Sequence, residues 1–279
     1  MMLNAPSKVV RGKILTVLKW AFFGIILLLL YFPILYIITQ SFNASTTGSS
    51  FTGFTFKWYV EMFNDRALMQ AIYNTISMAF LATIISVVAG TFFAIGINSM
   101  HKKRRRRIIL LNNIPILNAE VVTGVFLMLI FRFIAILLNI EIFGYTTMLI
   151  SHVFFCIPYV VLSVLPKLNE IDPNLYDAAL DLGCTPFKAL MKVIVPSIKT
   201  GIIVGGLIAF TMSIDDFVIS YMTMGRGVQN FSIWLYLIKN PLRNNAMQKA
   251  SAYNTLISIG TIVVLIVYNV LRSKKGKVK

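Results

Sequence analysis

The sequence predicts an all-α polytopic membrane protein with six transmembrane helices. Of its 279 residues, 57% are hydrophobic and 13% are charged, whereas soluble domains carry about 25% charged residues. Apolar runs of the roughly 20 residues that cross a bilayer recur six times. The runs are apolar on all sides instead of alternating, which favours helices over a membrane β-barrel. This composition excludes an ordinary cytosolic enzyme, a disordered tail and a secreted disulfide scaffold.

The six runs define the expected domain organisation. We expect a cytoplasmic tail at 1–19, a transmembrane domain at 20–271 and a basic cytoplasmic tail at 272–279. The spans are expected at about 20–39, 72–97, 114–138, 145–165, 201–224 and 251–270. The first run follows basic residues, but it is longer than the 7–15-residue apolar core of a signal peptide. It is therefore expected to remain as an uncleaved first helix.

The distribution of positive charge predicts the orientation. The net charge is +16, with 26 Lys and Arg residues. Of these, 19 lie in the two tails and in the second and fourth connections, so both termini are expected in the cytoplasm. The strongest basic run, 101–107, is interpreted as an anchor on anionic lipid. It has no aromatic residues nearby for base stacking, so no nucleic-acid partner is expected.

The fourth connection, 166–200, is more than a polar turn. Asp172 followed by a proline predicts a helix start, and Gly183 can end that helix. Thr185, also followed by a proline, predicts a second short helix that stops near Pro196. The first helix carries one apolar stripe: Leu175, Ala178, Ala179 and Leu182. From periodicity alone, a hairpin on the membrane surface and a docking element for a cytoplasmic partner remain equally open.

Three acidic residues interrupt the apolar spans: Glu120, Asp215 and Asp216. A charge at a helix centre costs about 2.5–3.5 kcal/mol on insertion scales, so such residues are candidates for a substrate pathway. A structural hydrogen-bonding role is the alternative. Neighbouring residues on a helix point about 100° apart, so we expect Asp216 to face the pathway and keep Asp215 as the alternative. Phe217 and Tyr221, on the same predicted helix, complete the candidate pathway set.

Other polar residues receive plainer interpretations. His152 is expected to be a packed, hydrogen-bonded helix residue, because no second ligand stands at metal-binding spacing. No metal site and no catalytic residue are predicted. The glycines within 201–206 are expected to allow close helix packing. The chain lacks the G-x-x-x-x-G-K-[ST] phosphate loop, so it is expected to bind no nucleotide and to hold no cofactor of its own.

The fourth connection resembles the EAA loop of permeases from bacterial ABC importers. That loop reads Glu-Ala-Ala, three residues, Gly, nine residues, Ile, one residue, Leu-Pro. Here 177–179 read Asp-Ala-Ala, and Gly183 and Pro196 stand at the family's spacing. Val193 and Val195 occupy the Ile and Leu positions. Asp in place of the usual Glu at the first position is a departure from the pattern.

Two further stretches narrow the resemblance. Residues 209–220, AFTMSIDDFVIS, are similar to the fifth span of permeases from spermidine/putrescine importers. Residues 151–161, SHVFFCIPYVV, are similar to their fourth span. The resemblance covers roughly 72–270, and Glu120 matches an acidic position early in the family's third span, although the Pro that commonly precedes it is missing.

The resemblance implies a type I ABC-importer (MetI-like) fold in a bacterial plasma (inner) membrane. It implies two copies of a cytoplasmic ATPase subunit that bind ATP and Mg, a second permease subunit and an extracytoplasmic polyamine-binding protein. The coupling helix would be Asp172–Gly183, with Asp177, Asp181 and Leu182 among the docking residues. Polyamines carry several positive charges, so their pathway needs carboxylates and aromatic faces.

Three alternatives stay open from the sequence. The solute of an ABC permease could differ, and ferric iron also suits carboxylates. An ATP-independent cation carrier could use the acids as a proton relay. A non-transporting membrane scaffold would leave the three intramembrane acids without a use.

Overall fold

The computed structural model describes residues 5–46, 50–238 and 245–276, and its regular elements there are all helices. The chain divides into two compact units. One unit combines Met1–Arg66 with Ile238–Lys279, and the other is Ala67–Leu237. The larger unit holds every residue of the predicted pathway and coupling loop.

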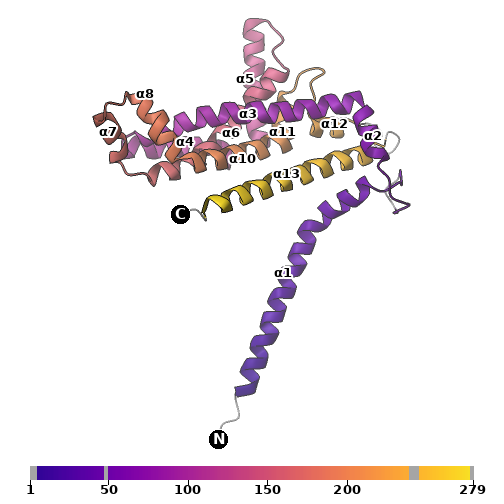
Figure 1. Cartoon of the computed structure of the whole chain (residues 1–279). Helices are drawn as coiled ribbons and strands as arrows, with labels where there is room; N and C mark the ends of the chain where they lie inside the picture. The colour runs from indigo at the N-terminus through magenta and orange to yellow at the C-terminus, as the bar shows by residue number, and fades with distance from the viewer. Residues whose placement is uncertain (1–4, 47–49, 239–244, 277–279) are drawn as a thin grey trace. The chain divides into compact units, whose positions relative to one another are not determined.

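The larger unit is a bundle of long and short helices arranged around α6 (Figure 1). Its main elements are α3 (Arg66–Asn98), α4 (Lys102–Leu117), α5 (Glu120–Leu138), α6 (Tyr145–Asn169), α10 (Lys199–Asp215), α11 (Val218–Thr223) and α12 (Phe231–Leu237). The inward face of α6 forms the centre of the apolar core, and buried side chains of α3, α5, α10 and α11 pack against it.

Glycines set how closely these helices approach one another. A Cβ added to Gly201 of α10 would lie 2.8 Å from the carbonyl oxygen of Ser163 on α6. One added to Gly205 would lie 3.1 Å from the Cα of Val160. On α3, a Cβ at Gly90 would lie 2.8 Å from the Cβ of the same valine. The expected close-packing role of the α10 glycines is thus confirmed, as small residues let membrane helices pack backbone to backbone.

The number of helices that could cross a membrane agrees only partly with the six predicted spans. Among the described residues, four helical segments are long and apolar enough to cross a membrane: Leu15–Ser41, Arg66–Asn98, Glu120–Leu138 and Tyr145–Asn169. A fifth candidate is a broken span, in which Pro186–Ser197 meets Lys199–Asp215 at 73°. The sixth predicted span lies inside α13 (Ala246–Gly276).

Two predicted helix boundaries are wrong. The helix of the third span begins at Glu120 instead of residue 114, because Asn118 and Ala119 have extended backbone after α4 ends. The acid thereby sits in the first turn of α5, where a negative charge is favourable. The fifth span is not one helix over 201–224, since α10 ends at Asp215 and α11 begins at Val218.

The predicted pair of short helices is present in the fourth connection. The first helix, α7, is Asn174–Asp181. At its start, the side chain of Asp172 accepts a 2.9 Å hydrogen bond from the Asn174 amide. Gly183 follows with φ +83°, a left-handed conformation that suits glycine. The second is formed by α8 (Pro186–Ala189), η1 (Leu190–Ile194) and α9 (Val195–Ser197), and it ends at Ser197, as expected near Pro196.

The smaller unit contains α1 (Ala5–Ser41), α2 (Lys57–Asn64) and α13. The indole nitrogen of Trp58 donates to the carbonyl of Asn43 at 2.6 Å, which ties α2 to the segment after α1. Lys249 of α13 forms a 2.5 Å ion pair with Asp65 at the end of α2. Side chains along the apolar part of α1 are mostly exposed, as expected for a helix surrounded by lipid.

Candidate functional site

A cavity of about 360 Å³ brings the three intramembrane acids together. Glu120 comes from the start of α5, while Asp215 and Asp216 come from the end of α10 and the break that follows it. Tyr159 of α6 and Thr211 of α10 add polar groups to the wall. The remaining lining residues are Pro115, Ile116, Asn118, Ala119, Thr123, Phe155, Met212 and Ile219. The site therefore joins residues that are about 95 positions apart in the sequence.

The three acids are in different environments within this site. Asp216 is buried, with 8% of its surface exposed. Glu120 and Asp215 are exposed. Carboxylate groups on the open side can meet a cation from the cavity, whereas a buried carboxylate needs partners inside the protein.

Asp216 has those partners. Its carboxylate accepts hydrogen bonds from the backbone amides of Ile219 at 3.3 Å and Ser220 at 2.7 Å, and from the Ser220 hydroxyl at 2.7 Å. It thereby caps the first turn of α11, whose amides would otherwise lack acceptors after the break. Asp215 is thus the more exposed of the two neighbouring aspartates, although Asp216 also lines the cavity.

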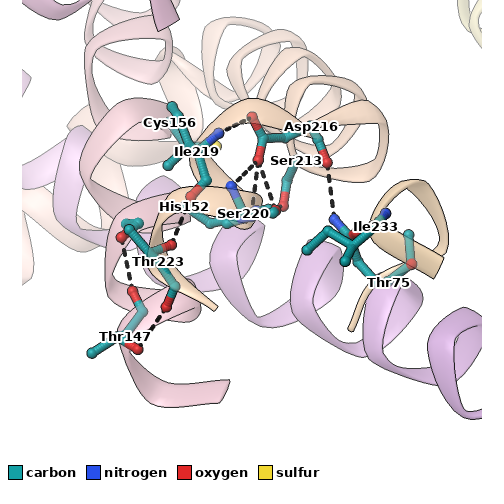
Figure 2. A network of polar contacts seen from close by, with 12 residues as sticks. Thr75, Thr147, His152, Cys156, Ser213, Asp216, Ile219, Ser220, Thr223 and Ile233 are labelled. Carbon is teal, nitrogen blue, oxygen red and sulfur yellow. Dashed lines mark hydrogen bonds and ion pairs between the residues drawn. The ribbon is translucent and has the colours of Figure 1, made fainter. Parts of the chain in front are cut away.

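His152 of α6 completes the polar network around the break. Its Nδ1 lies 2.6 Å from the hydroxyl of Ser213, and its Nε2 lies 2.8 Å from the hydroxyl of Ser220. Nε2 is also 3.6 Å from the Asp216 carboxylate. Figure 2 shows these side chains pointing toward one another. The interpretation of His152 as a packed, hydrogen-bonded residue is confirmed, but its link to Asp216 was not foreseen.

The break itself is supported from α12 and α3. The side-chain amide of Asn230 donates to the backbone carbonyl of Asp216 at 2.9 Å and accepts from the Ile233 amide at 2.9 Å. The amide of Phe231 donates to the Thr75 hydroxyl at 2.8 Å. Asn230 and Thr75 were absent from the predicted site. The sequence feature that could have indicated them is that both are polar residues in or beside apolar segments.

The aromatic part of the predicted pathway lies elsewhere. Phe217 and Tyr221 do not line the acidic cavity. Together with Tyr236 of α12 they form a cluster whose ring centroids are 5.1–5.6 Å apart. Tyr236 is 63% exposed. The structure therefore separates the five predicted pathway residues into an acidic group and an aromatic group.

The predicted coupling residues have unequal exposure. Ala179 is 6% exposed, so one residue of the predicted apolar stripe is covered within the chain itself. Leu182 is 87% exposed, and Phe187 at the start of the second helix is also exposed. Surface positions are occupied by Asp177, Ala178, Asp181, Gly183 and Pro196 as well. The free face is thus the end of α7 and the turn after it.

Comparison with protein-family models gives a match over more than half of the chain. Residues 105–276 match the family described as binding-protein-dependent transport system inner membrane component. The chain belongs to this family. It is therefore an inner membrane permease subunit of a transport system that works with a binding protein.

Relatives of this permease have related descriptions. It is 27% identical to the spermidine/putrescine transport system permease protein PotC of Haemophilus influenzae, over 93% of this chain and 98% of the relative. It is 30% identical to the putrescine transport system permease protein PotI of Escherichia coli strain K12, over 90% of this chain and 89% of the relative.

Solved structures support the permease fold. A bacterial ABC transporter involved in the import of the acidic polysaccharide alginate matches with a TM-score of 0.72 at 16% identity, over 96% of this chain and 98% of that chain. The same kind of transporter in complex with an alginate pentasaccharide-bound periplasmic protein matches with a TM-score of 0.68 at 15% identity, over 92% of this chain and 94% of that chain. These identities support the fold alone. The region matched by the family model contains both the acidic cavity and the coupling segment of this permease.

Proposed function

We propose that this chain is a permease subunit of an ATP-driven polyamine importer that takes up spermidine or putrescine. The observation that carries the proposal is the convergence of Glu120, Asp215 and Asp216 on one cavity within the apolar helices. Several carboxylates in one cavity suit a solute with several ammonium groups and would repel an anionic solute. The descriptions of PotC and PotI support the same solute class.

Within this proposal, the three acids have different tasks. Glu120 and Asp215 are exposed at the cavity, so their carboxylates contact the ammonium groups. A pair of opposite charges 4 Å apart contributes about 1 kcal/mol in bulk water and about 4 kcal/mol at an effective dielectric constant of 20, and exposed carboxylates lie toward the lower value. Tyr159 offers an aromatic face for the methylenes and the charge. Asp216 is a positioning residue, because its bonds to α11 keep the chain broken next to Asp215.

The proposal includes the rest of the transport assembly. Six spans with both termini in the cytoplasm place 166–200 on the ATPase side. A second permease completes the pathway, two ATPase subunits bind ATP and Mg, and an extracytoplasmic protein delivers the polyamine. The exposed end of α7, with Asp181 and Leu182, then docks on an ATPase subunit. This chain itself carries no ATP hydrolysis.

Uptake measurements test this function directly. Cells lacking this chain should lose uptake of labelled spermidine or putrescine, and the restored gene should recover it. Ferric iron and sulfate, measured in parallel, should enter equally with and without the chain. Loss of iron uptake with intact polyamine uptake would support a permease whose solute is ferric iron and would reject polyamines as the solute. Purification of the restored protein should also recover its ATPase subunit, whereas an ATP-independent carrier should purify without one.

A further inference from the structure

We propose that one face of α4 binds the headgroup of an anionic phospholipid and the first part of its acyl chain. Lys102, Arg105, Arg106, Ile109 and Leu110 line one cavity of about 340 Å³. Their spacing of three, one, three and one residues places them on a single face of the helix. The proposal is independent of the transported solute and goes beyond a general attraction of basic residues to the membrane.

The basic end of this face has no anionic partner among the residues that the structure describes. Six cations occupy 102–107, and in the part of the chain that the structure describes none of them pairs with a carboxylate. Arg105 donates a hydrogen bond to the side-chain oxygen of Asn169 on α6. That neutral partner orients the guanidinium and leaves its charge and other N–H donors for phosphate oxygens.

The apolar end of the face favours a lipid over a soluble anion. Leu110 lies four residues after Arg106, which is about 6 Å along a helix axis. That distance matches the step from the headgroup layer into the acyl chains, where interfacial segments bury about 5–10 Å. Leu110 is 62% exposed in this chain. A free phosphate would use the cations only, and an acidic protein surface would gain nothing from an aliphatic floor.

The same helix supplies a matched control. Lys103, Arg104 and Arg107 belong to the same basic run of α4 and do not line the cavity. The triple variant Lys102→Gln, Arg105→Gln and Arg106→Gln removes the proposed face. The triple variant Lys103→Gln, Arg104→Gln and Arg107→Gln removes the same charge from the same helix. A difference between the two variants therefore reports on the site and not on net charge.

Native mass spectrometry of the full chain in detergent measures the bound lipid. With added phosphatidylglycerol, the wild type and the control triple should retain the lipid in preference to phosphatidylcholine. The face triple should retain at least about tenfold less, because each Lys or Arg near an anionic surface contributes to binding. Inorganic phosphate at equal concentration should not displace the lipid.

Four results would overturn the proposal. The first is an equal loss of bound lipid in both triple variants, and the second is equal binding of phosphatidylglycerol and phosphatidylcholine. The third is displacement of the lipid by inorganic phosphate. The fourth is a face triple that retains the lipid but loses a protein partner. A second measurement covers the case in which the face triple does not insert. A photoactivatable phosphatidylglycerol, added to the wild-type chain in membranes, should label peptides within α4. Labelling confined to other segments would also reject the site.

Discussion

At the scale of single residues, two neighbouring aspartates have opposite surroundings. Asp215 is exposed at the acidic cavity, whereas Asp216 is buried among donors from α11 and beside His152. A carboxylate without internal partners can exchange its water for a ligand. A carboxylate that already accepts three hydrogen bonds holds the backbone instead. The two residues should therefore respond differently to substitution.

Replacing Asp215 by Asn should reduce polyamine uptake and leave the protein assembled. Loss of one ammonium–carboxylate contact of about 1.4 kcal/mol lowers uptake at low solute concentration about tenfold. Initial rates of labelled spermidine uptake, normalised to the amount of membrane-inserted chain, measure this. Glu61→Gln is the control, because it removes an acidic charge from α2, outside the cavity. Wild-type rates in Asp215→Asn would remove that carboxylate from the pathway.

Replacing Asp216 by Ala should instead destabilise the protein. The substitution leaves the amides of Ile219 and Ser220 without their acceptor, and each unsatisfied buried donor costs about 1–3 kcal/mol. We expect a lower thermal unfolding temperature in detergent and less assembled protein. Thermal stability equal to that of Asp215→Asn would contradict the positioning role.

The sequence identified the three acids but not their individual roles. Charges in apolar runs stand out because of their insertion cost. The choice between Asp215 and Asp216 assumed one continuous helix, and that assumption is wrong. The Asp216 carbonyl at the break is satisfied by Asn230, 14 residues away, and the start of α12 is bound in turn by Thr75, 156 residues away. Hydropathy within one span contains no information about such partners.

At the scale of helices and turns, the coupling segment depends on one glycine. Gly183 has φ +83°, and a Cβ added there would meet no atom of the described residues within 4 Å. Within this chain, a side chain at position 183 would therefore cost free energy only through backbone strain, about 1–2 kcal/mol for most residues. Asn adopts this conformation more readily, so it separates backbone strain from contact with a partner.

Under the docking proposal, Gly183→Ala and Gly183→Asn should both weaken ATP-driven uptake. Both variants should insert normally and keep the cavity intact. ATP hydrolysis and polyamine uptake by the reconstituted complex, measured together, give the coupling ratio. Normal coupling in the Asn variant alone would mean that the glycine serves the turn and not the approach of an ATPase.

Helix packing gives a second comparison between glycines. A methyl group at Gly201 of α10 would come within 2.8 Å of a backbone oxygen of α6, whereas one at Gly96 of α3 meets nothing within 4 Å. Gly201→Ala should lower stability by about 1–3 kcal/mol through overpacking. Gly96→Ala should leave it unchanged or raise it by up to about 1 kcal/mol. Thermal unfolding of the two purified variants measures the difference, and equal values would argue against tight α6–α10 packing in the membrane.

Helices were easier to predict than their ends. Apolar length predicted the long helices, and the cap-then-proline pattern predicted α8, where Thr185 accepts from the Lys188 amide. The break before Glu120 was missed, because Ile114, Pro115 and Ile116 extend the apolar run without being part of α5. Hydropathy indicates which segments can lie in a lipid bilayer, but it gives little information on where the backbone turns.

At the scale of the whole molecule, the distribution of basic residues predicts the topology. Alkaline phosphatase is active only outside the cytoplasm, so its insertion reports the side of each connection. Fusions at the C-terminus and after Met100 should be inactive, and one after Gly227 should be active. Green fluorescent protein at the same sites should give the reverse pattern. An active phosphatase at the C-terminus would reject the six-span arrangement.

The supported break after α10 also has a consequence for biogenesis. The ribosome completes α10 and the break before it synthesises Asn230, so the Asp216 carbonyl first leaves the exit tunnel without the amide that later satisfies it. Until 14 further residues have emerged from the tunnel, this segment is poorly suited to partition from the translocon into lipid. Stable integration of the fifth span therefore waits for the chain that follows it, and ribosomes stalled while Asn230 is still inside the exit tunnel should leave α10 and α11 beside the translocon.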